Sequence, residues 1–383
     1  MVIKDRIARA RLGALLRQFP IVTILGPRQI GKSTFAAWAL PDYERLDLED
    51  STVMLRLEDD AALLLAQSRR IIIDEAQRMP ALFPVLRHFV DRHPGQKVVL
   101  LGSASPALIR RISESLAGRT GFLEMSGISV REEREEPLWL RGGFPRLHWS
   151  RPRATPEDWF PAFLKTYSEQ DLPQLGFRLP AQKILRLLTM IAHSQGSLCN
   201  LSELGGSMGI NYHTVSHLLD IFEGTFLVRR LAPYHANLSK RLVKSPKIYI
   251  RDTGVLHHLL GIGFTKRALL SHPKAGASFE TFCLEQIVTL ARLEDPSAEA
   301  FFFRTQAGLE TDLLLRLHGE LIPIEIKLSL TGQSLRNLGQ VMSDLKLKRG
   351  FIVTLTPESA QVKKNVWAAP LAAVLDRLFA RSA

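Results

Sequence analysis

The hydrophobic residues in the first third of the chain fall into short runs, which are separated by longer stretches with helical spacing. Strand-like runs of this kind occupy residues 21–25, 43–48, 70–73 and 98–101. Strands that are this short and this uniformly apolar are typical of a parallel sheet with helices on both faces. The pattern therefore predicts an α/β domain with a parallel sheet over residues 1–135.

The hydrophobic pattern changes twice after this domain. Residues 136–178 are rich in Pro, Trp and Arg, which indicates a connector of turns with one short helix. Three helical segments and two strand-like runs then predict a winged helix-turn-helix over residues 179–255. One more helix and three strand-like runs predict an α/β domain over residues 270–383. The expected helices are 156–167, 182–193, 201–208, 211–222 and 278–293, and the expected strands are 225–231, 247–250, 300–304, 311–317 and 321–328.

Composition indicates the class of protein. The chain has 383 residues, of which 46% are hydrophobic and 23% are charged, as in globular proteins of two or three domains. No apolar run approaches the roughly 20 residues of a membrane helix, so no membrane partner is expected. The N-terminal segment lacks a secretory apolar core, and Cys199 and Cys283 lie far apart in apolar contexts. We therefore expect free buried thiols and a cytoplasmic location.

The chain is strongly basic, with 50 Lys and Arg residues against 38 Asp and Glu residues and a net charge of +12. Such an excess favours a polyanionic partner, because phosphates that are neutralised by Lys and Arg release counterions. DNA is the partner that this charge predicts. An arginine-rich proteome would give the same excess without any such partner.

The first strand runs directly into a phosphate-binding sequence. Gly26 and Gly31 are spaced as in a P-loop and are followed by Lys32 and Ser33. Glycines let the backbone aim several N–H groups at phosphate oxygens, the lysine reaches the β- and γ-phosphates, and the serine hydroxyl binds Mg²⁺. The competing interpretation is a Gly-rich turn without a nucleotide. The residues expected to contact ATP are Gly26, Pro27, Arg28, Gln29, Ile30, Gly31, Lys32, Ser33 and Thr34.

A second ATPase motif follows at residues 71–75, where a buried strand ends in two acids. Asp74 is predicted to hold Mg²⁺ through water, and Glu75 is predicted to orient and polarise the attacking water. Adjacent acids at a strand end also occur in ordinary surface turns. The P-loop upstream makes a Walker B motif the favoured interpretation, and catalysis then depends on positioning and charge neutralisation by Lys32, Ser33, Asp74 and Glu75.

The order of motifs resembles the prokaryotic AAA-type P-loop ATPases that carry a C-terminal conserved region of unassigned function, a DUF4143-like architecture. The resemblance covers almost the whole chain and rests on residues 26–34, 71–77, 102–106, 115–119, 142–145, 252–254, 310–312 and 324–327. The chain departs from the family pattern at Ala104 and Arg146.

The resemblance implies two further catalytic residues. Ser103 would sense the γ-phosphate, with Ser105 behind it; the alternative is that Ser105 caps the helix that begins at Pro106. Arg119 would add positive charge to the phosphates, in cis or across a subunit boundary, and the alternative is an exposed salt bridge. A homo-oligomer is suggested only by the wider ATPase class.

The winged-helix region contains a basic stretch without acids between Gly224 and Arg251. Basic residues beside a recognition-type helix are the arrangement that grips a DNA backbone. Winged helices in ATPases also act as protein-interaction lids, and basic runs are often solvated faces. The candidate DNA contacts are Tyr212, His213, Arg229, Arg230, Lys240, Arg241, Lys244 and Lys247.

Residues 311–327 are predicted to form a hairpin that turns at His318-Gly319. A two-residue turn places Asp312 opposite Glu325 and Glu310 opposite Lys327, with all four side chains on one face. Three acids and a lysine on one sheet face form the pattern of metal-dependent nucleases, restriction endonucleases among them. Asp312 and Glu325 would bind Mg²⁺, Lys327 would polarise water or phosphate, and Glu280 is a further candidate ligand. The alternative is a pair of cross-strand salt bridges.

The sequence therefore predicts an ATP-hydrolysing protein that acts on or with DNA, as a motor or remodeller in genome maintenance. An alternative is a nucleotide-dependent switch that binds a protein partner, in which the nuclease-like fold is only a structural or binding module. True endonuclease activity is a third possibility, which the hairpin acids raise.

Overall fold

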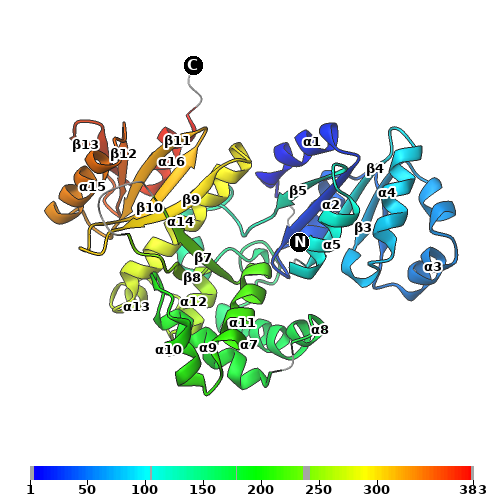
Figure 1. Ribbon diagram of the computed structural model, residues 1–383, viewed down its shortest axis with the longest axis horizontal. Coiled ribbons are helices and arrows are strands. Elements are labelled where there is room, and N and C mark those ends of the chain that lie inside the picture. Colours follow the sequence, from blue (N-terminus) through cyan, green and yellow to red (C-terminus); the bar gives the residue numbers. More distant parts are fainter. Residues whose placement is uncertain (1–3, 104–105, 178, 236–241, 381–383) are drawn as a thin grey trace. The chain divides into compact units, whose positions relative to one another are not determined.

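The computed structural model describes residues 4–103, 106–177, 179–235 and 242–380 (Figure 1). The chain forms two compact units, and each is built from separate stretches of sequence. The first unit comprises Met1–Glu132, Gly143–Ala154 and His217–Leu227, and the second comprises Glu133–Gly142, Thr155–Ser216 and Val228–Ala383. Within the described residues, no helix combines the length and the apolar content needed to cross a bilayer.

The first unit is an α/β fold around a parallel five-stranded sheet with the order β2-β3-β4-β1-β5. All six residues of β1 are buried, because this strand has neighbours on both sides and is covered on both faces. The four predicted strands are confirmed, and β5 is an addition. The elements are α1 (Ala8–Gln18), β1 (Ile21–Gly26), α2 (Lys32–Ala39), β2 (Glu44–Asp47), α3 (Ser51–Ala66), β3 (Arg70–Asp74), η1 (Ala76–Arg78), α4 (Leu82–Arg92), β4 (Lys97–Ser103), α5 (Pro106–Ser115) and β5 (Thr120–Glu124).

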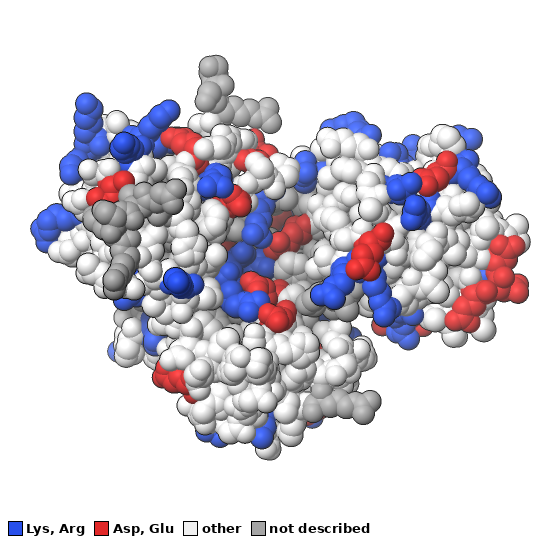
Figure 2. Space-filling view, in the orientation of Figure 1, with Lys and Arg blue, Asp and Glu red and all other residues white. Residues whose placement is uncertain are grey.

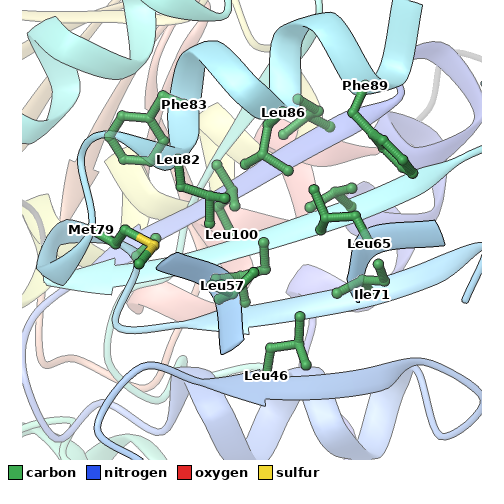
Figure 3. Close-up of a cluster of buried hydrophobic side chains, with 14 of the residues drawn as sticks. Leu46, Leu57, Leu65, Ile71, Met79, Leu82, Phe83, Leu86, Phe89 and Leu100 are labelled. Atoms are coloured by element: carbon green, nitrogen blue, oxygen red, sulfur yellow. The ribbon is translucent and has the colours of Figure 1, made fainter. Parts of the chain in front are cut away.

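One hydrophobic core of the first unit lies between its strands and the helices α3 and α4 (Figure 3). The apolar residues of α4 follow helical spacing, so that one side of the helix faces the sheet. Truncating a large side chain in such a core costs about 2–5 kcal/mol of stability. The core includes Leu46, Leu57, Leu65, Ile71, Phe83, Leu86, Phe89 and Leu100.

A segment from beyond residue 142 completes the first unit. The Gly143 carbonyl accepts a hydrogen bond from the Ile128 N–H (2.8 Å). A Cβ atom added to Gly127 would lie 3.0 Å from the Cα of Gly143, so the two backbones approach closely because both residues are glycine. The following stretch contains the short helix η2 (Pro145–Leu147).

The second unit is built on a mixed nine-stranded sheet with the order β13-β14-β12-β11-β10-β9-β7-β8-β6. Strand β7 pairs antiparallel with β8 and parallel with β9, where Ala232 faces Phe301. The strands predicted for the wing therefore share one sheet with the C-terminal strands. The sequence places a boundary between residues 255 and 270, and the sheet continues across it.

Some helices of the second unit, α14 to α16 among them, pack against its sheet, and α6 to α10 precede β7 in the sequence. They are α6 (Glu135–Arg141), α7 (Pro156–Thr166), η3 (Tyr167–Asp171), α8 (Leu172–Gln174), α9 (Ala181–His193), α10 (Leu201–Met208), α12 (Thr253–Leu259), α13 (Lys266–Leu270), α14 (Ala275–Glu294), α15 (Gly332–Asp344) and α16 (Leu371–Phe379). Helix α11 (Tyr212–Gly224) begins in the second unit and continues into the first.

The strands of the second unit include counterparts of the two strands expected in the winged-helix region and of the three expected after it. They are β6 (Ser197–Leu198), β7 (Val228–Pro233), β8 (Lys247–Ile250), β9 (Glu299–Arg304), β10 (Glu310–Leu317), β11 (Glu320–Ile326), β12 (Gly350–Val353), β13 (Ala360–Lys363) and β14 (Val366–Ala369). Helices α9, α10 and α11 precede β7 and β8 in the predicted order, and the winged-helix assignment stays a prediction.

The hairpin β10–β11 has the predicted register. Leu313 pairs with Ile324 and Leu317 pairs with Glu320, so the turn consists of His318 and Gly319. Both turn residues have positive φ angles, 48° and 79°, as a two-residue turn between twisted strands requires. The turn chemistry alone therefore determines which side chains of the two strands share a face.

Candidate functional site

The P-loop lies between β1 and α2 in the first unit. A Cβ atom added to Gly26 would lie 2.2 Å from the Met125 carbonyl oxygen, so only glycine fits where β1 ends. Gly31 adopts a φ of 90° and Gln29 a φ of 62°, which folds the loop back on itself. No side chain caps the N-terminus of α2, so the N–H groups of its first turn are available to an anion.

Lys32 begins helix α2 and is buried. Its ammonium donates to the carbonyl oxygens of Gly26 and Pro27, both at 2.9 Å. Burial lowers the pKa of Lys32 to about 8, although the negative charges of Glu75 and Asp74 oppose this shift. The ammonium is therefore held by the loop itself, within electrostatic range of both predicted Walker B acids.

Asp74 is the last residue of β3 and is buried. Its Oδ1 accepts from the Glu75 N–H (3.0 Å), and its Oδ2 lies 3.4 Å from Nη2 of Arg45 on β2. The sequence prediction did not include Arg45. Strand pairing could have indicated it, because Arg45 lies on the strand next to β3 and two residues before Asp47, which pairs with Asp74.

Glu75 follows β3 and has a φ of 53°, which is unusual for a residue other than glycine. A backbone in this region costs about 1–3 kcal/mol and is maintained only where its surroundings require it. The Gln77 side-chain amide donates to Glu75 Oε2. The Glu75 carboxylate is thus oriented by a residue that lies within the predicted motif but was given no role of its own.

The two remaining predicted catalytic residues lie at opposite ends of the parallel strands. Ser103 ends β4 in register with Gly26, next to the P-loop, while Ala104 and Ser105 lie outside the described residues. The Arg119 carbonyl accepts from the N–H of Ile21, at the start of β1. Because the P-loop follows the other end of β1, about 17 Å of strand separates the two.

Arg119 makes the salt bridge that was its alternative assignment. Its Nε and Nη2 donate to the two carboxylate oxygens of Asp91, both at 2.9 Å, and its Nη1 donates to the Ala117 carbonyl (2.8 Å). The suggestion that Arg119 reaches the phosphates in cis is therefore wrong. Residues before a strand of a parallel sheet lie at the edge away from the ligand, and this rule could have excluded the cis role from sequence.

The acids of the hairpin meet on one face in the second unit. Lys327 Nζ lies 2.8 Å from Asp312 Oδ2 and 3.0 Å from Glu325 Oε1. Asp312 Oδ2 also accepts from the Ile326 N–H at 2.8 Å. Glu325 Oε2 is buried and has no hydrogen-bond partner. The predicted side-by-side arrangement of Asp312, Glu325 and Lys327 is present.

A second lysine enters this group from β8. Lys247 Nζ lies 2.5 Å from Glu310 Oε1, 3.4 Å from Glu280 Oε1 and 3.7 Å from Asp312 Oδ1. The Tyr249 hydroxyl donates to the same Glu280 oxygen at 2.6 Å. We call the set Glu280, Glu310, Asp312, Glu325, Lys247 and Lys327 the carboxylate–lysine cluster.

The charges of the cluster alter one another's protonation. Burial and the neighbouring Asp312 charge raise the pKa of Glu325 to about 8, despite the opposing effect of Lys327. Burial alone would lower the pKa of Lys247, but Glu280, Asp312 and Glu310 reverse this and raise it. The two lysines are therefore firmly charged counter-ions of the acids.

The candidate DNA contacts are distributed between surface and interior. Arg229 is buried and donates to Glu285, which also accepts from Arg251 Nε at 3.0 Å. Lys247 belongs to the carboxylate–lysine cluster. We therefore withdraw Arg229 and Lys247 from the DNA-contact set. Lys240 and Arg241 lie outside the described residues, Arg230 is half-buried, and Tyr212, His213 and Lys244 are exposed.

Two family motifs explain a close backbone contact in the second unit. Asp252 caps helix α12 by accepting from the Val255 N–H (3.0 Å). A Cβ atom on Gly142 would lie 2.1 Å from Asp252 Oδ1, and one on Gly254 would lie 2.4 Å from the Arg141 carbonyl oxygen. Close packing therefore requires glycine at positions 142 and 254.

His257 is buried in the second unit in a single tautomer. Its Nδ1 donates to the Leu140 carbonyl (3.0 Å), and its Nε2 accepts from the Ser278 hydroxyl (2.7 Å), which in turn accepts from Trp139 Nε1 (2.9 Å). Burial lowers the pKa of His257 from 6.5 to about 4, although the Leu140 carbonyl opposes the shift. The neutral imidazole is therefore part of the fold.

We expect the stability of the second unit to fall as the pH falls from about 6.5 to about 4. The unfolded chain binds a proton at His257 in this range and the folded chain does not, so protonation favours unfolding by up to about 3 kcal/mol. Urea unfolding across this range should show a smaller pH dependence for His257→Gln than for the wild type. His193→Gln, at an exposed position of α9, should behave as the wild type. Equal pH dependence in His257→Gln would contradict the assignment.

Comparisons with known proteins were made for the whole chain. The family model described as "AAA domain" matches residues 18–133, and the model "Domain of unknown function (DUF4143)" matches residues 275–374. Between them, the model "Domain of unknown function (DUF8612)" matches residues 132–266. The uncharacterized proteins Mb2031c of Mycobacterium bovis and Rv2008c of Mycobacterium tuberculosis are each 42% identical over 360 residues, which is 92% of this chain and 80% of each relative. The chain belongs to the AAA-type P-loop ATPases with a C-terminal DUF4143 region.

Two solved structures are similar to this chain only at low sequence identity. The Walker-type ATPase PABY2304 of Pyrococcus abyssi is 15% identical with a TM-score of 0.45, over 67% of this chain and 96% of that one. A signal-transduction ATPase with a tetratricopeptide repeat sensor, PH0952 of Pyrococcus horikoshii, is 14% identical with a TM-score of 0.29, over 76% of this chain and 50% of that one. Family membership and the P-loop geometry make this chain a nucleotide-binding ATPase.

Proposed function

We propose that the chain is a Mg²⁺-dependent ATPase that acts with DNA. In the first unit, the P-loop and Lys32 would bind the triphosphate, and Ser33 and Asp74 would hold Mg²⁺. These oxygen donors suit Mg²⁺, and the buried Asp74 carboxylate already has a cation, Arg45, 3.4 Å away. Mg²⁺ would neutralise charge on the phosphates, while Glu75, held by Gln77, orients water toward them.

One observation carries the ATPase part of the proposal. The Lys32 ammonium is held on the carbonyls of Gly26 and Pro27, and its pKa responds to both Asp74 and Glu75. A bound triphosphate would compete with these two carbonyls for the ammonium. Lys32, Asp74 and Glu75 therefore lie together at the carboxyl ends of parallel strands of one sheet.

The DNA part rests on the start of helix α11. Asn211 caps this helix by accepting from the Thr214 N–H (2.8 Å). Tyr212 is 50% exposed, and its ring centre lies 3.9 Å from that of His213. An exposed aromatic pair at a helix N-terminus suits stacking on bases and contact with phosphate. We propose local contacts at Tyr212, His213 and Lys244, which are all exposed. On the face in view in Figure 2, Lys and Arg are interspersed with Asp and Glu.

The test combines DNA binding with ATP turnover. Labelled duplex and forked DNA should bind at low salt, and DNA should raise turnover in a reaction that EDTA stops. Tyr212→Ala should weaken binding by about fivefold or more, and Lys244→Ala should lower the salt dependence by about one ion. Lys183→Ala, an exposed lysine on α9, is the matched control. Absence of binding at low salt, together with turnover that ignores DNA, would remove the DNA part and leave the ATPase part.

A second candidate function is a nucleotide-dependent switch that binds a protein partner. It is favoured by the burial of Arg229 and Lys247, because both cations are engaged by acids of the second unit and neither can contact a phosphate backbone. Slow, DNA-insensitive turnover with ATP-dependent co-purification of one protein would favour the switch over the DNA proposal.

A further inference from the structure

We infer that Lys247 takes the position of a divalent cation in the carboxylate–lysine cluster, so that the cluster does not bind Mg²⁺ while this lysine is present. The nuclease-like pattern of Asp312, Glu325 and Lys327 implies a Mg²⁺ site there. The inference rests on the proposed nuclease-like character of this cluster, and it depends on neither ATP hydrolysis nor DNA binding.

The contacts of Lys247 are those of a central cation. One ammonium group is shared by Glu310 at 2.5 Å, Glu280 at 3.4 Å and Asp312 at 3.7 Å, from two different elements, β10 and α14. The Lys247 side chain is only 3% exposed, so water cannot replace these partners. A single positive charge surrounded by three carboxylates occupies the place that a metal ion would need.

The position of Lys247 in the sheet shows that it is an addition to the hairpin pattern. Lys247 begins β8, which is separated from β9 by β7, and its ammonium lies 5.6 Å from the centre of the Phe302 ring on β9. The side chain therefore extends across the sheet toward the acids. Lys327, by contrast, follows β11 and pairs with Asp312 and Glu325 on its own hairpin.

The remaining donors do not fit a Mg²⁺ ion as they stand. Mg²⁺ requires about six oxygen ligands at roughly 2.0–2.1 Å in octahedral geometry. Asp312 Oδ2 and Glu325 Oε1 are engaged by Lys327, and Glu310 is engaged by Lys247 and by Arg304 at 3.4 Å. Among the described residues, no group of three or more Asp, Glu, His or Cys side chains is arranged to hold a metal ion.

The charge balance predicts what happens when Lys247 is neutralised. Glu280, Glu310 and Asp312 all surround the Lys247 ammonium, so the loss of this cation removes the positive charge that they share. Glu325 Oε2 is buried without a hydrogen-bond partner, and Asp312 Oδ1 would lose its lysine. These two oxygens, with the Glu280 carboxylate that Tyr249 orients, would then be able to take up a divalent cation from solution.

The experiment measures Mn²⁺ binding to the nucleotide-free full-length chain, by the loss of the free Mn²⁺ signal in electron paramagnetic resonance. The wild type and Lys247→Met are compared with Lys183→Met, an exposed lysine on α9 of the same unit. We expect Lys247→Met to gain one Mn²⁺ site at least tenfold tighter than any in the wild type or in Lys183→Met. Adding Asp312→Asn to Lys247→Met should remove the new site. The first-unit site is common to all variants and cancels in the comparison.

A second variant protects the test against a folding failure. Lys247→Met combined with Glu310→Gln removes one positive and one negative charge together and keeps Asp312, Glu325 and Glu280. It is expected to unfold near the wild-type temperature and to bind Mn²⁺. Two results would overturn the inference: a folded variant that lacks the additional Mn²⁺ site, or a wild type that already has a site of equal affinity and loses it in Asp312→Asn. ATP turnover and DNA binding, measured on the same proteins, report separately on the proposed function.

Discussion

Glu75→Gln is expected to lower ATP turnover by about 100-fold or more while ATP still binds, because an amide cannot accept a proton from the attacking water. The substitution keeps the side-chain length, so the Gln77 amide can still donate to the remaining carbonyl oxygen. Glu75 also has a φ of 53°, and Gln carries the same backbone preference, so the loop should keep its conformation. The loss therefore falls on the chemical step.

The measurement is single-turnover hydrolysis at saturating ATP, with nucleotide binding followed separately by fluorescence of a labelled ATP. Glu49→Gln serves as the matched control, since Glu49 is an exposed acid that pairs with Arg78 at 3.4 Å near the same edge of the sheet. Turnover in Glu75→Gln within threefold of the wild type would show that another group orients the water.

Lys32→Ala is expected to weaken ATP binding by roughly 10- to 100-fold, since a hydrogen bond to a charged group contributes about 1.5–3 kcal/mol. The ammonium is the only positive charge that the P-loop pattern itself places at the β- and γ-phosphates. Without it, the carbonyls of Gly26 and Pro27 would also face the incoming phosphates with no cation between. Turnover should fall with binding, because both depend on the same charge.

Lys97→Ala is the control for this second substitution. Lys97 is also in the first unit, and its ammonium also donates to a backbone carbonyl, that of Phe19 at 3.0 Å. It begins β4, at the end of the strand that is away from the P-loop. Both variants therefore lose a comparable internal contact, and only Lys32→Ala loses a phosphate contact. Equal ATP affinities in the two variants would contradict the assignment of Lys32.

Much of the first unit could be predicted because its signals are local. Each central strand is a short apolar run, and the P-loop follows β1 at a fixed spacing, so neither needs knowledge of distant residues. The hairpin register was predictable for the same reason, because the two-residue turn at His318 and Gly319 fixes which residues of β10 and β11 pair with each other. The position of Asp312 beside Glu325 follows from that turn.

The errors concern charged residues whose partners are remote in sequence. Arg229 and Lys247 look like solvent-facing bases in a run without acids, but Glu285 and Glu280 on α14 neutralise them across more than 30 residues of chain. Their burial depends on the sheet that joins β7 to β9, and no local pattern records that pairing. The cis role of Arg119 fails for another reason, since its place at the start of β5, away from the P-loop, follows from strand direction, and the salt bridge with Asp91 is the alternative that the sequence left open.

Each unit consists of separate stretches of sequence, which limits where the gene or the protein can be divided without breaking a unit. A fragment that ends at Glu132, close to where the match to the AAA domain stops, contains every strand of the first sheet but lacks Gly143. The Ile128 N–H would lose its hydrogen-bond acceptor, and Gly127 would lose its backbone contact with Gly143. Neither unit corresponds to one uninterrupted stretch of coding sequence. A recombination event at this border would therefore divide the ATPase unit itself, and selection would tend to transmit the two units together.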